Sequence, residues 1–332
     1  MTIQPLASRP REISVTEPLG AAYHRMKLVL FSPFDAGKWL IIGFCAWLAQ
    51  LGESGGGGGY GYNNRAFGDK HQQSWDGIRH AYSVAHDYVV VNLVWLVPVA
   101  AFAFLLLLAL GLLFIWLSSH GKFMFVHCIA ENRAEIEIPW HQYGPVANRL
   151  FLLRLVLCVA GLILLLPLVV VLILLIVRMI QAGDFHVIQI FLLAGIACGV
   201  AVVALALGLV QKVVNDFVVP ILYLRGGTCR AAGREFFQLL GAHAGTFVLY
   251  LLFQILLAIV LGLMVLWLVL LTCCTAGCLL AIPYIGTVCL LPILVFQRAY
   301  ALCFLAQFGP AYDVFPPAAP PPLAPPSGLR PV

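Results

Sequence analysis

The sequence predicts an all-α, polytopic membrane protein with six transmembrane helices, arranged as three hairpins that are preceded by cytoplasmic amphipathic helices. Composition is the first observation: 62% of the residues are hydrophobic and 10% are charged, against roughly 45–50% and 25% in soluble domains. The second is a series of apolar blocks, most of which reach the roughly 20 residues that a helix needs to cross the hydrocarbon core. These observations exclude a water-soluble fold.

The apolar blocks differ in how well they fit a simple crossing. The first is short and needs Phe34 to Lys38 to extend it. The last contains Pro283 and Pro292, which interrupt helical hydrogen bonding, so we expect it to be kinked or partly re-entrant. No secretory signal precedes the first block, so that block is expected to be retained. The predicted crossings are residues 34–51, 89–117, 150–177, 187–210, 246–271 and 276–296.

An amphipathic stretch precedes each odd-numbered block. The first begins after Thr16, a candidate N-cap, and ends before Pro33. The second covers residues 139–149 and the third covers residues 230–240. Each is expected to lie in the plane of the lipid head groups. The aromatic residues expected to anchor the chain at this interface are Trp39, Trp140, Tyr143 and Phe236.

The basic residues are distributed unequally between the two sides of the membrane. The segments before the first block, after the even-numbered blocks and at the C-terminal end hold 14 of the 19 Lys and Arg residues. By the positive-inside rule both termini are cytoplasmic and the chain lies in the inner membrane. Basic segments next to a membrane attract anionic lipids by about 1 kcal/mol per residue. The net charge of +5 therefore follows from the membrane topology and requires no nucleic-acid partner.

The domain organisation follows from composition. Residues 1–15 are expected to be a disordered N-terminus, and residues 16–309 are expected to be the membrane domain. Residues 310–332 contain nine of the 20 prolines and predict a disordered, proline-rich tail. The predicted outward loop, residues 52–87, has a glycine run at residues 55–59 without the Lys and Ser or Thr of a phosphate-binding loop, so this run is interpreted as a flexible linker.

The cysteines predict packing rather than a metal site. Cys273, Cys274 and Cys278 lie close together, and a disulfide among them is an open alternative if they face an oxidising compartment. A metal site needs a further ligand, but no His, Asp or Glu occurs between Gln254 and Asp313. No metal and no cofactor is expected.

The even-numbered blocks end alike, with polar residues just before an aromatic one. Asp216 follows Lys212 by one helical turn, which allows the lysine to neutralise the carboxylate. If the three ends converge, they form a polar cluster that is either a functional site or a set of ion pairs fixing the hairpins. Its members are Asp216, Asn215, Lys122, Arg298 and Lys212. Elsewhere, Arg154 is expected to extend toward the cytoplasmic interface, and Gln254 is expected to be structural.

The fourth block contains a GxxxG motif formed by Gly195 and Gly199. Small residues at this spacing allow two helices to approach closely. They predict either packing within the bundle or a homo-oligomer interface.

The layout resembles uncharacterised bacterial six-helix membrane proteins that are similar to the membrane domain of glycerophosphodiester phosphodiesterase fusions. The matching features are Ser32-Pro33-Phe34 before Trp39, Gln307-Phe308-Gly309-Pro310 after the last block, and the paired blocks from Leu19 to Phe315. The phosphodiesterase barrel is absent, so the resemblance implies a membrane module and no catalytic residues.

The sequence contains no nucleophile elbow, no Walker loop and no His/Cys spacing of a catalytic zinc site. We therefore expect a non-enzymatic membrane scaffold that organises lipid or a partner protein. A small-solute transporter or channel with a polar cytoplasmic mouth is the alternative, and a membrane-embedded lipid enzyme ranks third.

Overall fold

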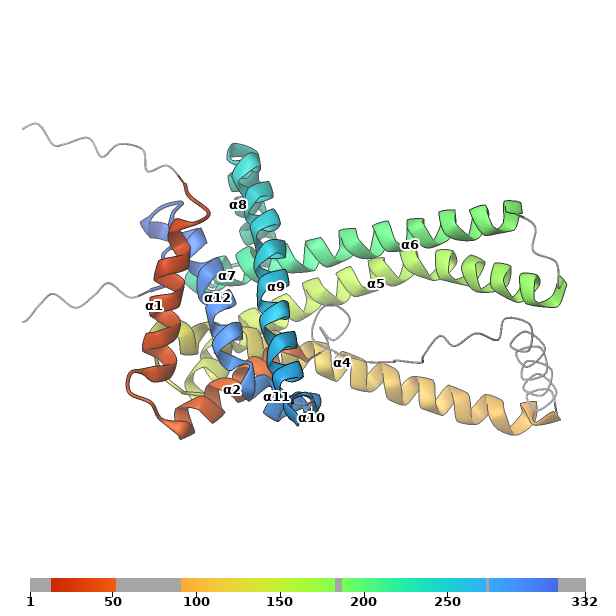
Figure 1. Ribbon diagram of the computed structural model, residues 1–332, viewed down its shortest axis with the longest axis horizontal. Coiled ribbons are helices and arrows are strands. Elements are labelled where there is room, and N and C mark those ends of the chain that lie inside the picture. Colours follow the sequence, from red (N-terminus) through yellow and green to blue (C-terminus); the bar gives the residue numbers. More distant parts are fainter. Residues whose placement is uncertain (1–12, 52–90, 183–186, 273–274, 316–332) are drawn as a thin grey trace, which may run out of the picture.

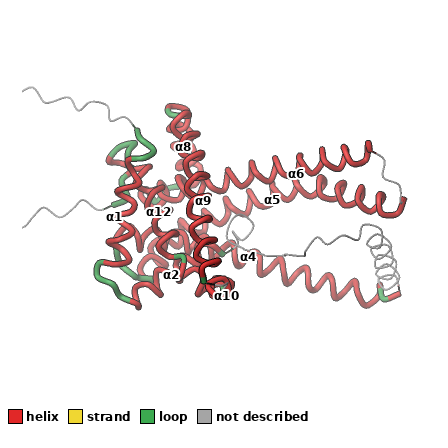
Figure 2. Tube along the Cα trace, in the orientation of Figure 1, coloured by secondary structure: helices red, strands yellow, loops and turns green. Residues whose placement is uncertain are grey.

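The computed structural model describes residues 13–51, 91–182, 187–272 and 275–315. Every regular element in these ranges is a helix (Figure 2), which agrees with the all-α prediction. Three long helices, α4 (Leu93–Glu131), α5 (Glu137–Ala182) and α6 (Val187–Val213), extend from a compact body at one end of the molecule (Figure 1). The body contains α1 (Glu17–Phe31), α2 (Ala36–Gln50), η1 (Val214–Val218), α7 (Val219–Arg225), α8 (Cys229–Ala242), α9 (Ala244–Leu271), α10 (Thr275–Ala281), α11 (Pro283–Cys289), α12 (Leu291–Ala306) and η2 (Pro310–Tyr312).

Four helical stretches are long and apolar enough to cross a membrane. They are Val94–Glu131, Glu137–Met179, Val187–Arg225 and Ala244–Leu271, and a fifth is added if α11 and α12 count as one broken span. These helices are typical of a membrane protein. The count of six and the three-hairpin arrangement stay predictions, because the first and last blocks do not form simple spans.

The first predicted crossing, residues 34–51, forms the 15-residue helix α2. At 1.5 Å per residue such a helix covers about 22 Å, which is less than the roughly 30 Å of a hydrocarbon core. One side of α2, including Ile42, Cys45 and Leu48, is buried. This helix therefore packs within the body and does not meet the length expected of a span.

The last predicted crossing is broken, as its prolines indicated. Residues 276–296 fall on α10, α11 and the first part of α12, and α11 and α12 are bent by 66° at the break. Pro283 and Pro292 each stand in the first turn of a helix, where the missing N–H costs nothing. The prolines thus mark helix starts rather than kinks inside one helix.

Helix α4 has two halves with different surroundings. Residues 94–110 are exposed on every side, although all of them are apolar, whereas residues 118–130 are buried. The buried half packs tightly on α2 at Gly121, where a Cβ would lie 2.5 Å from the Ala49 nitrogen and 2.6 Å from the Leu48 carbonyl carbon. Only glycine allows the two backbones to approach this closely.

The segments around α1 hold the two described ends of the chain together. The Ser14 N–H donates to Gln307 Oε1 at 2.8 Å, and Gln307 Nε2 donates to the Ser14 carbonyl at 2.9 Å. Val15 and Val314 are buried. Residues 13–15 and 310–315 therefore belong to the packed body, so both predicted disordered ends are too long at these positions. Residues 1–12 and 316–332 lie outside the described chain.

The predicted amphipathic helices take two different forms. The first, α1, buries Ala22, Val29 and Leu30 and packs on α12. The second is continuous with its crossing in α5, a single helix of 46 residues. The third, α8, is a separate helix that begins at the N-cap Thr228, whose side chain accepts from the Ala231 N–H. Thus α1 and α8 are separate helices with buried and exposed residues, whereas the second stretch is the first part of α5, and the placement of these stretches at the lipid head groups stays a prediction.

The long helices run in two directions. α5 and α6 lie side by side, and α9 runs across the direction of the three arms, α4, α5 and α6 (Figure 1). α9 packs on α12 through Tyr250, whose ring lies parallel to that of Tyr300 at a centroid distance of 5.7 Å. The four candidate spans therefore do not form one parallel bundle in this arrangement.

Candidate functional site

A π-helical turn, η1, interrupts the path from α6 into α7. The Val219 N–H donates to the Val214 carbonyl, five residues earlier. Pro220 follows at once, and in an α-helix its ring would clash with the Asp216 carbonyl four residues before it. The wider turn avoids this clash. Turns of this kind inside helices occur frequently at functional sites, and η1 carries both Asn215 and Asp216.

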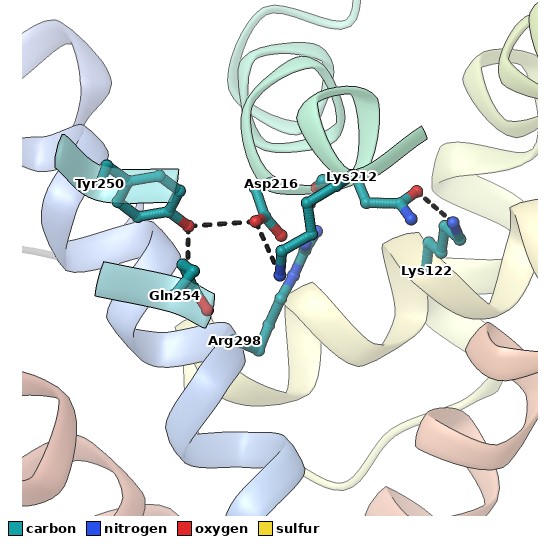
Figure 3. A network of polar contacts seen from close by, with 7 residues as sticks. Lys122, Lys212, Asp216, Tyr250, Gln254 and Arg298 are labelled. Carbon is teal, nitrogen blue, oxygen red and sulfur yellow. Dashed lines mark hydrogen bonds and ion pairs between the residues drawn. The ribbon is translucent and has the colours of Figure 1, made fainter. Parts of the chain in front are cut away.

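Asp216 is 6% exposed and lies at the centre of a polar network (Figure 3). Lys212 Nζ lies 3.0 Å from Asp216 Oδ2, and the Tyr250 hydroxyl donates to the same oxygen at 3.1 Å. Gln254 Nε2 donates to the Tyr250 oxygen at 2.9 Å. The carboxylate is thus paired with a cation and tied to α9, as a buried charge requires.

Asn215 joins two further helices to η1. Lys122 Nζ on α4 donates to Asn215 Oδ1, and Arg298 Nη1 on α12 donates to the Asn215 carbonyl at 2.6 Å. Lys122 is 5% exposed. The structure therefore brings all five residues of the predicted cluster together, with Lys212 and Asp216 on one side of η1 and Lys122 and Arg298 meeting at Asn215.

Different elements position these side chains. Lys122 lies on the buried half of α4, one residue after Gly121, where the backbones of α4 and α2 are in close contact. Arg298 lies on α12, beyond the break at Leu290. Tyr250 and Gln254 are one turn apart on α9. The network therefore fastens α4, α6, α9 and α12 to one another at the level of the π-turn, which is a structural task that it can perform without a ligand.

Chemically, the described part of the chain contains no group of three His, Cys, Asp or Glu residues that could hold a metal ion. Asp216 is the one buried acidic side chain among the described residues. A general acid–base pair needs two titratable groups within reach of a substrate. The titratable groups next to Asp216 are Lys212 and Tyr250, and both already contact its carboxylate.

Sequence reasoning missed Tyr250, because a single tyrosine within a long apolar run gives no sign of a polar partner. The spacing of Tyr250 and Gln254, one turn apart, was the available signal. It also misplaced Arg154, which does not extend to the surface: this side chain is buried, and Nη1 donates to Ser118 Oγ at 2.9 Å. Ser118 in turn donates to the Ala49 carbonyl, so Arg154 links α5 to the contact between α2 and α4.

The predicted interface anchors lie in the body rather than at a free surface. Trp39 donates through Nε1 to the Leu30 carbonyl, Trp140 packs against Trp116, and Tyr143 stacks on Tyr223. These three residues are half-buried.

The prediction that Phe236 anchors the chain at the membrane interface is wrong. This side chain is 3% exposed, because its ring packs between Phe217 and Phe247, whereas its neighbour Phe237 is 68% exposed. The aromatic side chain of α8 that can reach a bilayer surface is Phe237.

The GxxxG motif makes little contact within the described bundle. A Cβ at Gly195 would meet nothing within 4 Å, and one at Gly199 would meet only Leu168 Cδ2 at 4.0 Å. The predicted outer-loop residues 52–87 lie outside the described chain, as do Cys273 and Cys274, so the disulfide alternative stays a prediction.

Residues 13–291 match the model of a family described as "Family of unknown function (DUF7544)". The search of curated proteins and the search of solved structures found no match. The resemblance to the membrane domain of phosphodiesterase fusions stays a prediction.

Proposed function

Since the chain belongs to the DUF7544 family of unknown function, we propose, from its own geometry, that it is a non-enzymatic integral membrane protein that organises anionic lipid. The single observation that carries this proposal is the exposed face of α8. Arg230, Arg234 and Phe237 follow one another at intervals of four and three residues, and all three are exposed. The opposite face, with Ala232 and Phe236, is buried in the body.

Two arginines beside an exposed phenylalanine match the chemistry of a lipid interface. The guanidinium groups attract phosphate head groups by about 1 kcal/mol each, and the ring can enter the boundary of the acyl chains. The body holds α8 rigidly: Arg225 on α7 pairs with Glu235 at 2.6 Å, and Arg149 on α5 donates to the Gly227 carbonyl at 3.0 Å. Little ordering is therefore needed when lipid binds.

The apolar arms support placement in a bilayer. Residues 94–110 of α4 are apolar and exposed on all sides, and a helix that is hydrophobic all round is stable in hydrocarbon. The described chain ends are hydrogen-bonded to each other through Ser14 and Gln307. This contact supports an even number of crossings, and the distribution of basic residues supports cytoplasmic termini in the inner membrane.

The first test is lipid analysis of the full-length protein extracted with its surrounding lipid. We expect enrichment of anionic lipid over the bulk membrane, and a smaller enrichment in the R230Q/R234Q variant. The matched control is R178Q, because Arg178 is exposed near the far end of α5 and should leave the enrichment unchanged. Equal lipid composition in wild type and bulk membrane would refute the proposal.

A second candidate is a small-solute transporter or channel, and the buried Asp216 on a π-turn is the observation that favours it. Under this alternative Asp216 and Lys212 would exchange their mutual contact for contact with a solute. Reconstituted wild-type protein would then conduct a small ion or solute, and Asp216→Asn would abolish the flux. Flux that is the same with Asp216→Asn as with wild type would remove this candidate.

A further inference from the structure

Two buried cysteines face each other where α2 crosses α4. Cys45 on α2 and Cys128 on α4 have no exposed surface, and their Sγ atoms are 4.0 Å apart. The two helices are pressed together at Gly121, seven residues before Cys128. The pair is therefore held between rigid elements and is not formed by mobile loops.

An open pocket of about 380 Å³ lies where the start of α2 meets the end of α4, and neither cysteine lines it. Its lining includes Ile41, one turn before Cys45 on α2, and Asn132, one turn after Cys128 at the end of α4. Lys38 also lines the pocket and donates to Asn132 Oδ1 at 2.8 Å. A peroxide therefore reaches the two buried thiols only when the side chains that cover them move.

We propose that Cys45 and Cys128 form a redox-reactive pair that closes to a reversible disulfide when a hydroperoxide reaches it. One thiolate attacks the peroxide O–O bond, which breaks as an S–O bond forms, and the leaving oxygen takes up a proton. The second thiolate then displaces the oxygen of the sulfenic acid, which forms the S–S bond and releases water. With hydrogen peroxide, two thiols and one peroxide give one disulfide and two waters.

The 4.0 Å separation suits this chemistry. A disulfide needs about 2 Å between the sulfur atoms, so the thiols are unbonded and must approach each other by about 2 Å to react. The bond would join α2 covalently to the half of α4 that carries Lys122 and so fasten the helix crossing below the polar network. An isolated thiol already packs as a small hydrophobe, so packing alone does not require that the two cysteines face each other.

The test uses the purified full-length protein. It is exposed to hydrogen peroxide, quenched, denatured, alkylated with a maleimide and digested without reduction. We expect a peptide that links Cys45 to Cys128, a mass about 2 Da below that of the two thiol peptides combined, and loss of the link after reduction.

Variants identify the pair. C45S or C128S should abolish the link and leave a sulfenic acid that dimedone traps on the remaining cysteine. C158S and C198S, which change exposed cysteines of α5 and α6, should leave the link intact. Because the link is mapped in wild-type protein, a variant that fails to fold does not weaken the test. Wild-type protein that retains both thiols after peroxide treatment, or that links either one to another cysteine, would overturn the proposal.

Discussion

Asp216 is the residue whose substitution separates charge from hydrogen bonding. Asp216→Asn keeps an oxygen for the Tyr250 hydroxyl and loses the ion pair with Lys212, whose side chain is 41% exposed. Because a partly exposed pair contributes little, the expected cost is about 1 kcal/mol or less. Asp216→Leu also leaves the buried Tyr250 hydroxyl without its acceptor, which adds about 1–3 kcal/mol. Thermal unfolding in detergent measures both, and an Asn variant less stable than the Leu variant would contradict this assignment.

Phe236 and Phe237 provide a matched pair of adjacent residues. Phe236→Ala opens a cavity among Phe217 and Phe247, and we expect it to cost about 3–5 kcal/mol. Phe237 is 68% exposed, so Phe237→Ala should change the stability in detergent by less than about 0.5 kcal/mol and should weaken the contact with lipid. The melting temperatures of the two variants test this prediction, and similar losses at both positions would show that α8 is rotated from the orientation described above.

At the scale of elements, the contact between α2 and α4 depends on one glycine. In Gly121→Ala the new methyl group would lie 2.5 Å from the Ala49 nitrogen, and because that atom is backbone it cannot move aside without moving α2. Gly111 is on the same helix, with nothing within 4 Å of an added Cβ. We therefore expect Gly121→Ala to lower the melting temperature and Gly111→Ala to leave it unchanged or raise it. Equal melting temperatures would mean that α2 is not seated at Gly121.

The sequence predicts elements better than it predicts their inward faces. Long runs of apolar residues predict the central parts of α4, α5, α6 and α9, and Pro283 and Pro292 predict the break in the last block. The inward face of α8 could not be derived, because Phe236 and Phe237 are chemically identical and only the neighbours Phe217 and Phe247 decide which one is buried. The similar ends of the even-numbered blocks predict the five-residue cluster. They do not predict that Tyr250 joins it, because that contact depends on how α9 packs on η1.

At the scale of the whole molecule, the open GxxxG face of α6 bears on oligomeric state. We propose that Gly195 and Gly199 contact a second copy, since little of the described chain covers them. Gly195→Leu combined with Gly199→Leu should shift the protein to a monomer in light scattering, while Gly208→Leu, at another uncovered glycine of the same helix, should not. An unchanged mass for the double variant would exclude this interface.

The most direct test of the lipid-organising function is native mass spectrometry of the full-length protein titrated with phosphatidylglycerol or with phosphatidylcholine. We predict that wild-type protein prefers the anionic lipid and that the R230Q/R234Q variant loses about 2 kcal/mol of this preference, or roughly thirtyfold in affinity. R178Q should behave as wild type. Equal affinity of wild-type protein for the two lipids, or a preference that survives R230Q/R234Q, would contradict the role of α8.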